Sequence, residues 1–336
     1  MWRRAVVGGR PARYGEGGKG QLVVFLHGWG LGQHSYKRPL KRLVQQGARV
    51  IAPALPGFGG SADLAGPLTF PAYARWVDEF LTTIGVAEPV VLVGHSFGGG
   101  VATQLAHDYP WWVRSLVLVN SLGGPVHDAT GPDPGLVAER PLWNWAWRLP
   151  RDLAGRDQMA KALPAVLEDL LPNVLANPFG LWRVANLARS ADLTAELDQL
   201  RRRRLPIVAV WGDEDRVIPR ASFDALCTAI GTQGQVVPGS HSWLLADPDH
   251  FGRVMTNVLA IARLADTPVS PWPPADGRTA STHARRPGPR LPRQQAACGR
   301  SRPPTVTRFP GGTRTGERHL ARRTSPPTPE QHTPGG

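Results

Sequence analysis

Ser96 stands in the segment GHSFG at residues 94–98, with a glycine two positions away on each side. A run of β-forming residues at 90–93 precedes this segment, and residues 101–107 follow it with apolar positions spaced as on a helix face. This order predicts a strand, a sharp turn with the serine at its tip, and a helix. Very small neighbours leave the backbone room to bend so sharply, and a helix N-terminus brings unpaired N–H groups to the serine. The turn therefore suits a nucleophile whose reaction develops negative charge.

The same pattern also occurs in ordinary glycine-rich turns, so other loops must supply the rest of a reactive site. A buried-strand pattern at residues 21–26 runs into the loop HGWG at residues 27–30. Its glycines allow backbone N–H groups to turn inward, and acyl transfer needs two such donors for the developing oxyanion. We expect the N–H groups of Trp29 and Phe97 to form this pair, and His27 to brace the loop.

Three carboxylates follow another predicted strand, at residues 206–211. Asp213, Glu214 and Asp215 lie just beyond its carboxyl end, at the sheet edge where the serine is expected to emerge. A carboxylate there can orient a catalytic histidine, although acids in such loops are also common in solvated turns. The residues alone leave the choice among the three open.

His241 is the histidine best placed to act as a base. It follows a short predicted strand at residues 235–237, and none of the other histidines has a comparable position. His95 is next to Ser96 in the chain, but we expect it to point to the opposite side of the turn. The residues therefore predict a Ser96–His241 pair with a carboxylate behind it.

These segments together resemble the α/β-hydrolase family of serine hydrolases. The resemblance covers roughly residues 5–265, and its motifs occur in the chain order of nucleophile, acid and histidine that the family uses. The matching motifs are HGWG at 27–30, LPGFGGS at 55–61, GHSFGG at 94–99, WGDEDRVIP at 211–219 and PGSHSWLLADP at 238–248.

The resemblance implies that Ser96 is the nucleophile, His241 the base and Asp215 the acid, with Asp213 and Glu214 as loop residues. Asn120 occupies the position that some relatives use for the acid, and Ala54 replaces an aspartate that is common before the LPGFGGS motif. The resemblance implies no metal ion and no organic cofactor.

The rest of the chain predicts an α/β fold with a mostly parallel central sheet and helices on both faces, because strand and helix patterns alternate. Strands are expected at 21–26, 49–52, 90–93, 115–119, 206–211 and 235–237, and helices near 38–46, 69–84, 99–109, 219–230 and 248–264. Asp247 precedes a proline and is expected to cap the last helix rather than to act as the acid. We divide this region into residues 1–121 and 206–265, which form the hydrolase core.

The alternation stops between residues 122 and 205. Helical patterns at 142–149, 158–171, 181–190 and 192–204 suggest an inserted helical domain, which the resemblance implies is a cap over the site. Four tryptophans in the insert either pack against the core or line an apolar substrate pocket. They are Trp143, Trp145, Trp147 and Trp182.

The segment 266–336 has a different composition. It holds 14 prolines, 12 arginines and only four acidic residues, and too few apolar side chains to offset the entropy of ordering. We expect it to be disordered and to contribute most of the net charge of +13. Weak contact with a polyanion is possible for such a segment, but the charge does not indicate a specific nucleic-acid-binding fold.

Two cysteines exclude a disulfide framework and a cysteine-based zinc site. No stretch approaches the ~20 apolar residues needed to cross a bilayer, so we expect a cytoplasmic protein. The expected partner is a small, apolar acyl substrate, and carboxylic ester hydrolysis is the first expectation for its reaction. The resemblance also extends to carbon–carbon bond hydrolases of ring-cleavage products. A third interpretation is a binding protein that has the fold but no activity.

Overall fold

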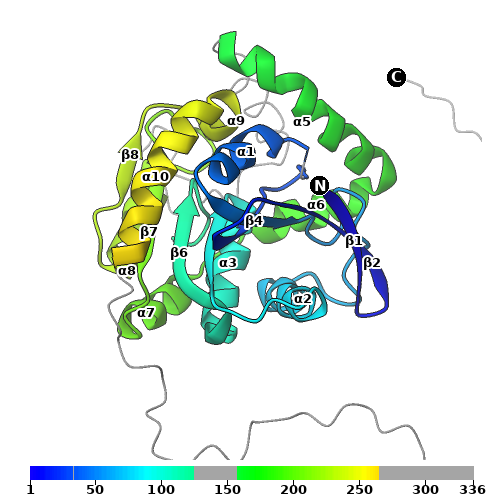
Figure 1. Cartoon of the computed structure of the whole chain (residues 1–336), viewed down its shortest axis with the longest axis horizontal. Coiled ribbons are helices and arrows are strands. Elements are labelled where there is room, and N and C mark those ends of the chain that lie inside the picture. Colours follow the sequence, from blue (N-terminus) through cyan, green and yellow to red (C-terminus); the bar gives the residue numbers. More distant parts are fainter. Residues whose placement is uncertain (33, 125–156, 265–336) are drawn as a thin grey trace, which may run out of the picture. The chain divides into compact units, whose positions relative to one another are not determined.

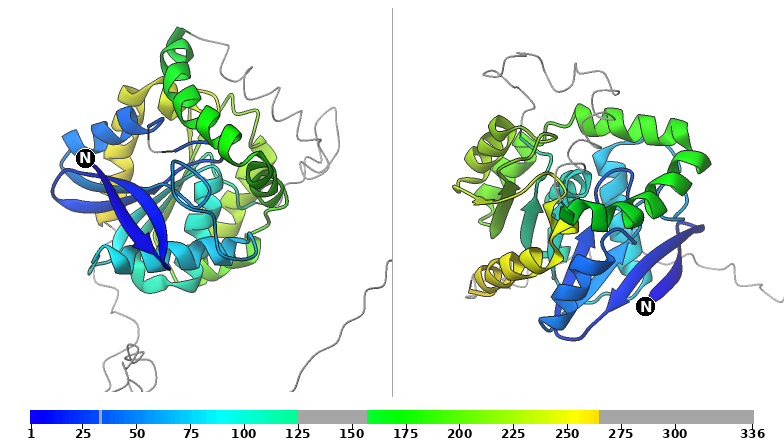
Figure 2. Two further views of the ribbon diagram at one scale, coloured as in Figure 1. Left: turned by 90° about the vertical axis from the view of Figure 1, so that its right-hand side faces the viewer. Right: turned by 90° about the horizontal axis from the view of Figure 1, so that it is seen from above.

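The computed structural model describes residues 1–32, 34–124 and 157–264 (Figures 1 and 2). An eight-stranded sheet with the order β1-β2-β4-β3-β5-β6-β7-β8 forms its centre. The β1–β2 and β2–β4 pairs are antiparallel, and all the other pairs are parallel. The strands are β1 Trp2–Val7, β2 Arg10–Gly17, β3 Gln21–Leu26, β4 Ala48–Pro53, β5 Val90–His95, β6 Val113–Val119, β7 Ile207–Gly212 and β8 Gln235–Val237.

Helices cover both faces of this sheet (Figure 1), which confirms the predicted fold class. Helices α2, α3, α7 and α8 pack on one face, and α1, α9 and α10 pack on the other. The helices of the core are α1 Lys37–Gln45, α2 Phe70–Thr83, α3 Phe97–Asp108, the short 3-10 helix η1 Pro110–Trp112, α8 Arg220–Ile230, α9 Trp243–Ala246 and α10 Pro248–Leu264.

The central strand β3 shows why the sheet is buried on both sides. Val23 and Phe25 face the cluster that contains α1 and α10, whereas Leu22, Val24 and Leu26 face the cluster that contains α2 and α3. Side chains alternate between faces with a period of two, so a strand that is apolar at every position needs cover on both faces. The carboxyl ends of such parallel strands then share one edge of the sheet.

The N-terminal hairpin of β1 and β2 is absent from the elements predicted above. Gly8 and Gly9 form its two-residue turn, with φ angles of 54° and 77°, as the primed hairpin turns require. The signal for this turn is present in the sequence as a Gly-Gly pair. The strands beside it, WRRAVV and RPARYGEG, are only partly buried and lack the continuous apolar run of the central strands, so they were not predicted.

The described part of the insert between β6 and β7, residues 157–205, contains three helices near positions predicted for them: α5 Asp157–Ala176, α6 Pro178–Arg189 and α7 Thr194–Arg202. Figures 1 and 2 show α5 and α6 in green. Helix α7 packs against α3 and α8, with Leu197 and Leu200 buried in the core cluster. The predicted helix at 142–149 and the segment 266–336 lie outside the described residues.

Two smaller expectations concern the C-terminal part of the core. The Asp247 carboxylate accepts the N–H of His250 at 2.9 Å, so Asp247 caps α10 as predicted. Within the described ranges, no helix has the length and apolar character needed to span a bilayer.

Candidate active site

The chain turns sharply at Ser96, between the end of β5 and the start of α3. Ser96 has φ 54° and ψ −121°, a conformation that L-residues rarely adopt. Its N–H donates to the carbonyl of Val119, and its own carbonyl accepts the N–H of Leu122. These bonds to the end of β6 hold the strained residue in place.

Close packing of backbone explains the glycines around the serine. A Cβ atom on Gly98 would meet the main chain of Leu26, and one on Gly94 would meet the main chain of Gly98 and Gly99. Neither obstacle is a flexible side chain that could move away. The spacing of glycines in GHSFG is therefore a steric requirement of this turn.

His241 approaches Ser96 from the loop after β8. Its Nε2 lies 3.0 Å from Ser96 Oγ, and its side chain is only 6% exposed. The serine hydroxyl can donate to Nε2 at this distance. A serine and a histidine from distant parts of the chain are thus brought within hydrogen-bonding reach.

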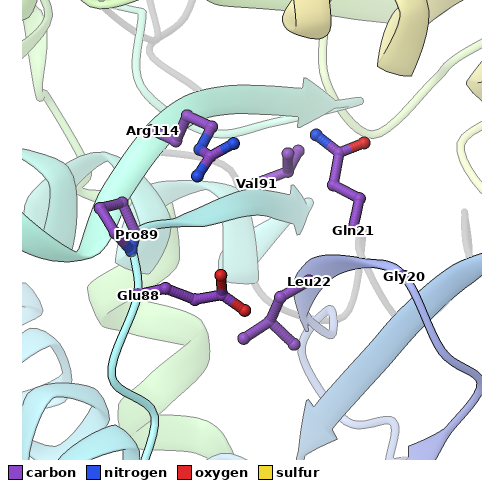
Figure 3. A pocket seen from close by; sticks show the side chains of 7 residues that line it. All are labelled: Gly20, Gln21, Leu22, Glu88, Pro89, Val91 and Arg114. Carbon is purple, nitrogen blue, oxygen red and sulfur yellow. The ribbon is translucent and has the colours of Figure 1, made fainter. Parts of the chain in front are cut away.

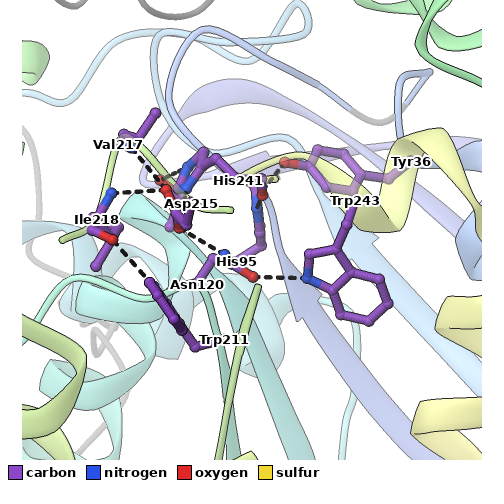
Figure 4. Close-up of polar contacts among 10 residues, drawn as sticks. Tyr36, His95, Asn120, Trp211, Asp215, Val217, Ile218, His241 and Trp243 are labelled. Atoms are coloured by element: carbon purple, nitrogen blue, oxygen red, sulfur yellow. Dashed lines mark hydrogen bonds and ion pairs between the residues drawn. The ribbon is translucent and has the colours of Figure 1, made fainter. Parts of the chain in front are cut away.

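Asp215 lies behind the imidazole, and its Oδ2 is 2.8 Å from His241 Nδ1. Its Oδ1 accepts the backbone N–H groups of Val217 and Ile218 at 2.7 and 2.9 Å, and its side chain is fully buried (Figure 4). A carboxylate that accepts several N–H bonds is held in one orientation.

The other two acids of this loop lie elsewhere. Asp213 accepts the backbone N–H of Gly239 at 2.9 Å, and Glu214 is exposed. The bond from Gly239 ties the loop after β7 to the loop that carries His241. The structure therefore brings Asp215, rather than Asp213 or Glu214, to the imidazole.

Asn120 and Trp243 extend the polar network, and the sequence did not assign them this role. Asn120 Nδ2 donates to Asp215 Oδ2 at 2.6 Å, and Trp243 Nε1 donates to Asn120 Oδ1 at 2.8 Å (Figure 4). Asn120 has φ 45°, one of the few positive values at a non-glycine residue in the described ranges. Its place at the end of β6, the alternative acid position, was the available signal.

The loop after β3 lies directly beside the serine. A Cβ on Gly28 would be 3.4 Å from Ser96 Cβ, and the next residue is Trp29. The indole N–H of Trp29 donates to the carbonyl of Leu181 in α6 at 2.9 Å, which fixes the side chain. Phe97 is the first residue of α3, where backbone N–H groups have no partner within the helix. The loop that contains Trp29 and the start of α3 at Phe97 thus both lie beside Ser96.

His27 braces this loop, as expected. Its Nε2 accepts the N–H of Leu55 at 2.8 Å, and its Nδ1 donates to the carbonyl of Gly28 at 2.9 Å. Burial lowers the pKa of His27, because the imidazole is removed from water. The neutral ring links the loop after β3 to the loop after β4.

The insert contributes a second set of contacts to the same loop, through α5. Asp169 Oδ2 accepts the N–H of Gly32 and both the N–H and the hydroxyl of Ser35, at 2.6–3.1 Å, and its Oδ1 lies 3.0 Å from His34 Nδ1. Asn173 donates to the carbonyl of Gly30 at 3.1 Å. The sequence alone does not mark Asp169 and Asn173, because a single sequence does not show which polar positions of a helix are buried.

Of the four predicted pocket tryptophans, the structure describes only Trp182. Its side chain stacks on Phe179 with ring centroids 5.8 Å apart, and it is 51% exposed. No hydrogen bond or ring contact within the described ranges joins it to the Ser96–His241–Asp215 set. Trp143, Trp145 and Trp147 lie outside the described residues.

A separate pocket of about 240 Å³ lies at the opposite edge of the sheet (Figure 3). Gln21, Val91 and Arg114 line it, and these residues lie near the amino ends of β3, β5 and β6. Ser96 follows the carboxyl end of β5, so this pocket is not part of the candidate site.

The Alpha/beta hydrolase family matches residues 23–251. The chain is 32% identical over 251 residues to a Shigella flexneri protein named "Putative carbamate hydrolase RutD", and the match covers 71% of this chain and 91% of that protein.

Solved structures give the same result for the fold. A thermophilic esterase from Thermogutta terrifontis is 22% identical with a TM-score of 0.59, covering 78% of this chain and 99% of that one. A bromoperoxidase from Bacillus anthracis is 20% identical with a TM-score of 0.65, and the match covers 77% of this chain and 100% of that one. The sheet order, the turn at Ser96 and the family match together show that this chain belongs to the α/β-hydrolase family.

Proposed function

We propose that this protein is a serine hydrolase that cleaves a carboxylic ester or a related acyl bond. The observation that supports this most strongly is the continuous contact from Ser96 Oγ to His241 Nε2 at 3.0 Å and from His241 Nδ1 to Asp215 at 2.8 Å. Nucleophile, base and orienting carboxylate in this order are the parts that acyl transfer through a serine needs.

In the first half of the reaction, Ser96 Oγ attacks the acyl carbon while His241 Nε2 takes the hydroxyl proton. The carbonyl π electrons move to oxygen, and the N–H groups of Trp29 and Phe97 donate to the resulting oxyanion. When the tetrahedral intermediate collapses, His241 gives its proton to the leaving alcohol, and an acyl-enzyme remains. Asp215 holds the imidazole in the tautomer with Nδ1–H and stabilises the imidazolium.

In the second half, water replaces the alcohol. His241 removes one proton from the water as its oxygen attacks the acyl-enzyme, and the same two N–H groups hold the second oxyanion. Collapse releases the carboxylic acid and returns the proton to Ser96 Oγ. Each oxyanion donor is worth ~3 kcal/mol of barrier in comparable sites, so the position of the loop at Trp29 affects the rate strongly.

The proposed substrate class follows from what Ser96, His241, Asp215 and the two N–H donors can act on without further groups. A carboxylic ester needs only the residues named above, and a carbamate, the class printed in the name of the Shigella relative, presents the same kind of carbonyl carbon. We further assign the insert at residues 122–205 as a cap over the core of residues 1–121 and 206–265. Helix α6 contacts the Trp29 side chain, and α5 contacts the loop that follows it. The expected substrate is small and apolar, and the expected compartment is the cytoplasm.

A panel of nitrophenyl esters of increasing acyl length tests this function. The wild-type protein should hydrolyse the shorter esters, and Ser96→Ala should abolish the activity without changing the circular dichroism spectrum. Retained turnover in Ser96→Ala would show that the assignment is wrong. A phenyl carbamate and a ring-cleavage dienoate in the same panel separate acyl hydrolysis from carbon–carbon cleavage.

A further inference from the structure

A chain of hydrogen bonds passes beneath the candidate nucleophile and joins the two loops on either side of it. The backbone N–H of Gly28 donates to the Tyr36 hydroxyl at 3.0 Å, and this hydroxyl lies 2.7 Å from His95 Nδ1. On the other side of its ring, His95 Nε2 lies 3.1 Å from the carbonyl oxygen of His241 (Figure 4). Gly28 belongs to the loop between β3 and α1, which also contains the proposed donor Trp29 and is called the oxyanion loop below. His241 is the proposed base.

The direction of each bond is fixed by its ends. A carbonyl oxygen only accepts, so His95 Nε2 must carry the proton that it shares with His241. A neutral imidazole then has a bare Nδ1, which accepts the proton of the Tyr36 hydroxyl. The Tyr36 oxygen in turn accepts the N–H of Gly28. Every donor in this series of hydrogen bonds therefore meets an acceptor, and none of the groups in the series needs a charge.

Burial keeps the chain of bonds in this state. Tyr36 is fully buried, and His95 is 1% exposed. Removal from water, with the neighbouring His241 as the next cause, lowers the pKa of His95 to about 3. Burial likewise raises the pKa of the Tyr36 hydroxyl. Both side chains thus stay neutral across the pH range in which a histidine base works.

The fit around these groups is close. A Cβ atom on Gly28 would lie 3.0 Å from His95 Nδ1 and 3.1 Å from the Tyr36 hydroxyl. The His95 and His241 rings also pack together, with centroids 5.1 Å apart. A side chain at position 28 would therefore push against both polar groups and shift them by a few tenths of an ångström.

We propose that Tyr36 and His95 are positioning residues, which hold the oxyanion loop and the base loop at a fixed separation across Ser96. This inference rests on the proposed function, because it assigns the pair a role in that reaction. Neither side chain touches the substrate. They act through the backbone of Gly28, which precedes the Trp29 donor, and through the backbone of His241. Errors of about 1 Å in such placements cost ~100-fold in rate.

Tyr36→Phe tests this directly, because it removes only the hydroxyl. We expect kcat for a short nitrophenyl ester to fall about tenfold or more while KM changes little. The matched control is Tyr73→Phe, which removes another fully buried hydroxyl, one that donates to the Pro56 carbonyl at 3.3 Å. The control should lose a similar amount of thermal stability and keep its kcat. Equal kcat in the two variants would overturn the proposal.

His95→Gln tests the other end of the chain of bonds. Glutamine keeps a donor for the His241 carbonyl but removes the acceptor for Tyr36, so its kcat should fall as well. Because the two residues act as one unit, the double variant should be no slower than the slower single variant. Independent effects that multiply in the double variant would contradict the proposal.

A measurement without turnover separates this inference from the proposed function. In the Ser96→Ala background, ¹⁵N NMR of labelled histidine should show His95 protonated at Nε2 and bare at Nδ1 down to about pH 5. Adding Tyr36→Phe should shift the imidazole resonances of His241, and adding Tyr73→Phe should not. If the wild type hydrolyses no ester, the proposed function fails, and these spectra still decide the placement. Unchanged His241 resonances would overturn it.

Discussion

Asn120 Nδ2 lies 2.6 Å from Asp215 Oδ2, the same oxygen that faces His241 Nδ1. The asparagine amide and the imidazole therefore share one carboxylate oxygen, while two backbone N–H groups occupy the other. The indole N–H of Trp243 donates to Asn120 Oδ1 and so fixes the orientation of the amide. The orientation of Asp215 thus depends on Asn120, which follows β6, on the backbone of its own loop after β7, and on Trp243 in α9.

Removing the Asn120 amide should loosen this arrangement. Asn120→Ala takes away a charge-assisted hydrogen bond, typically worth about 2 kcal/mol, and we expect kcat to fall ~10-fold with a modest loss of stability. Steady-state kinetics on a nitrophenyl ester measure the effect. Asn186→Ala is the control, since that side chain only donates to the exposed Trp182 carbonyl. An unchanged kcat in Asn120→Ala would show that Asp215 needs no such support.

The choice of Asp215 as the acid gives a sharper prediction. Asp215→Asn places an amide against His241 Nδ1 and favours the wrong imidazole tautomer, so kcat should drop about 10⁴-fold. Glu214→Gln, one residue away and exposed, should leave kcat within about twofold. A similar loss in both variants would mean that the loop, rather than the carboxylate, is what matters.

The contact between α5 and the oxyanion loop predicts a stability effect. Asp169→Asn weakens its bonds to the loop at Gly32 and Ser35 and leaves buried donors without good acceptors, which costs about 2 kcal/mol. Urea unfolding measures this cost. The neighbouring Glu168→Gln, on the exposed side of α5, should change the free energy of unfolding by less than about 0.5 kcal/mol. Equal stability of the two variants would contradict the role of Asp169.

His95 makes stability depend on pH with a definite sign. Its folded-state pKa of about 3 lies below the usual histidine pKa of 6.5, so between these values the unfolded chain binds a proton that the folded chain does not. The free energy of unfolding therefore falls as pH decreases below about 6.5, by up to ~1.4 kcal/mol per pH unit from this residue.

Urea titrations of the wild type and His95→Gln at several pH values between 7 and 4.5 check this dependence. The variant lacks the titrating ring, so its stability should fall less steeply on acidification. His27, whose pKa is also lowered by burial, contributes a similar slope in both proteins and cancels in the comparison. Parallel pH profiles for the two proteins would show that His95 is not the source.

The sequence was sufficient to predict the parallel strands of the sheet, most of its helices, and the loops that carry Ser96, Asp215 and His241. The turn at Ser96 is predictable because its glycines are a local steric requirement, and the loops of Asp215 and His241 because each follows a strongly apolar strand. The family resemblance was needed to choose Asp215, since its two acidic neighbours look equivalent until the backbone shows which one reaches the imidazole.

Other parts depend on long-range contacts that local patterns do not encode. Tyr36 lies at the start of a helix and His95 beside the nucleophile, and only the fold shows that their side chains meet. Asp169 looks like a surface acid of an amphipathic helix, but the loop at Gly32 buries it. The hairpin of β1 and β2 was missed because neither strand has the continuous apolar run that marks the central strands.

Labelling with a fluorophosphonate probe, followed by peptide mass spectrometry, is the most direct measurement of the central claim that Ser96 is a nucleophile activated by His241. The wild type should carry one phosphonyl group, on Ser96, and His241→Ala should react far more slowly while retaining its fold. No adduct on the wild-type protein, or an adduct that persists on another residue in Ser96→Ala, would contradict the account.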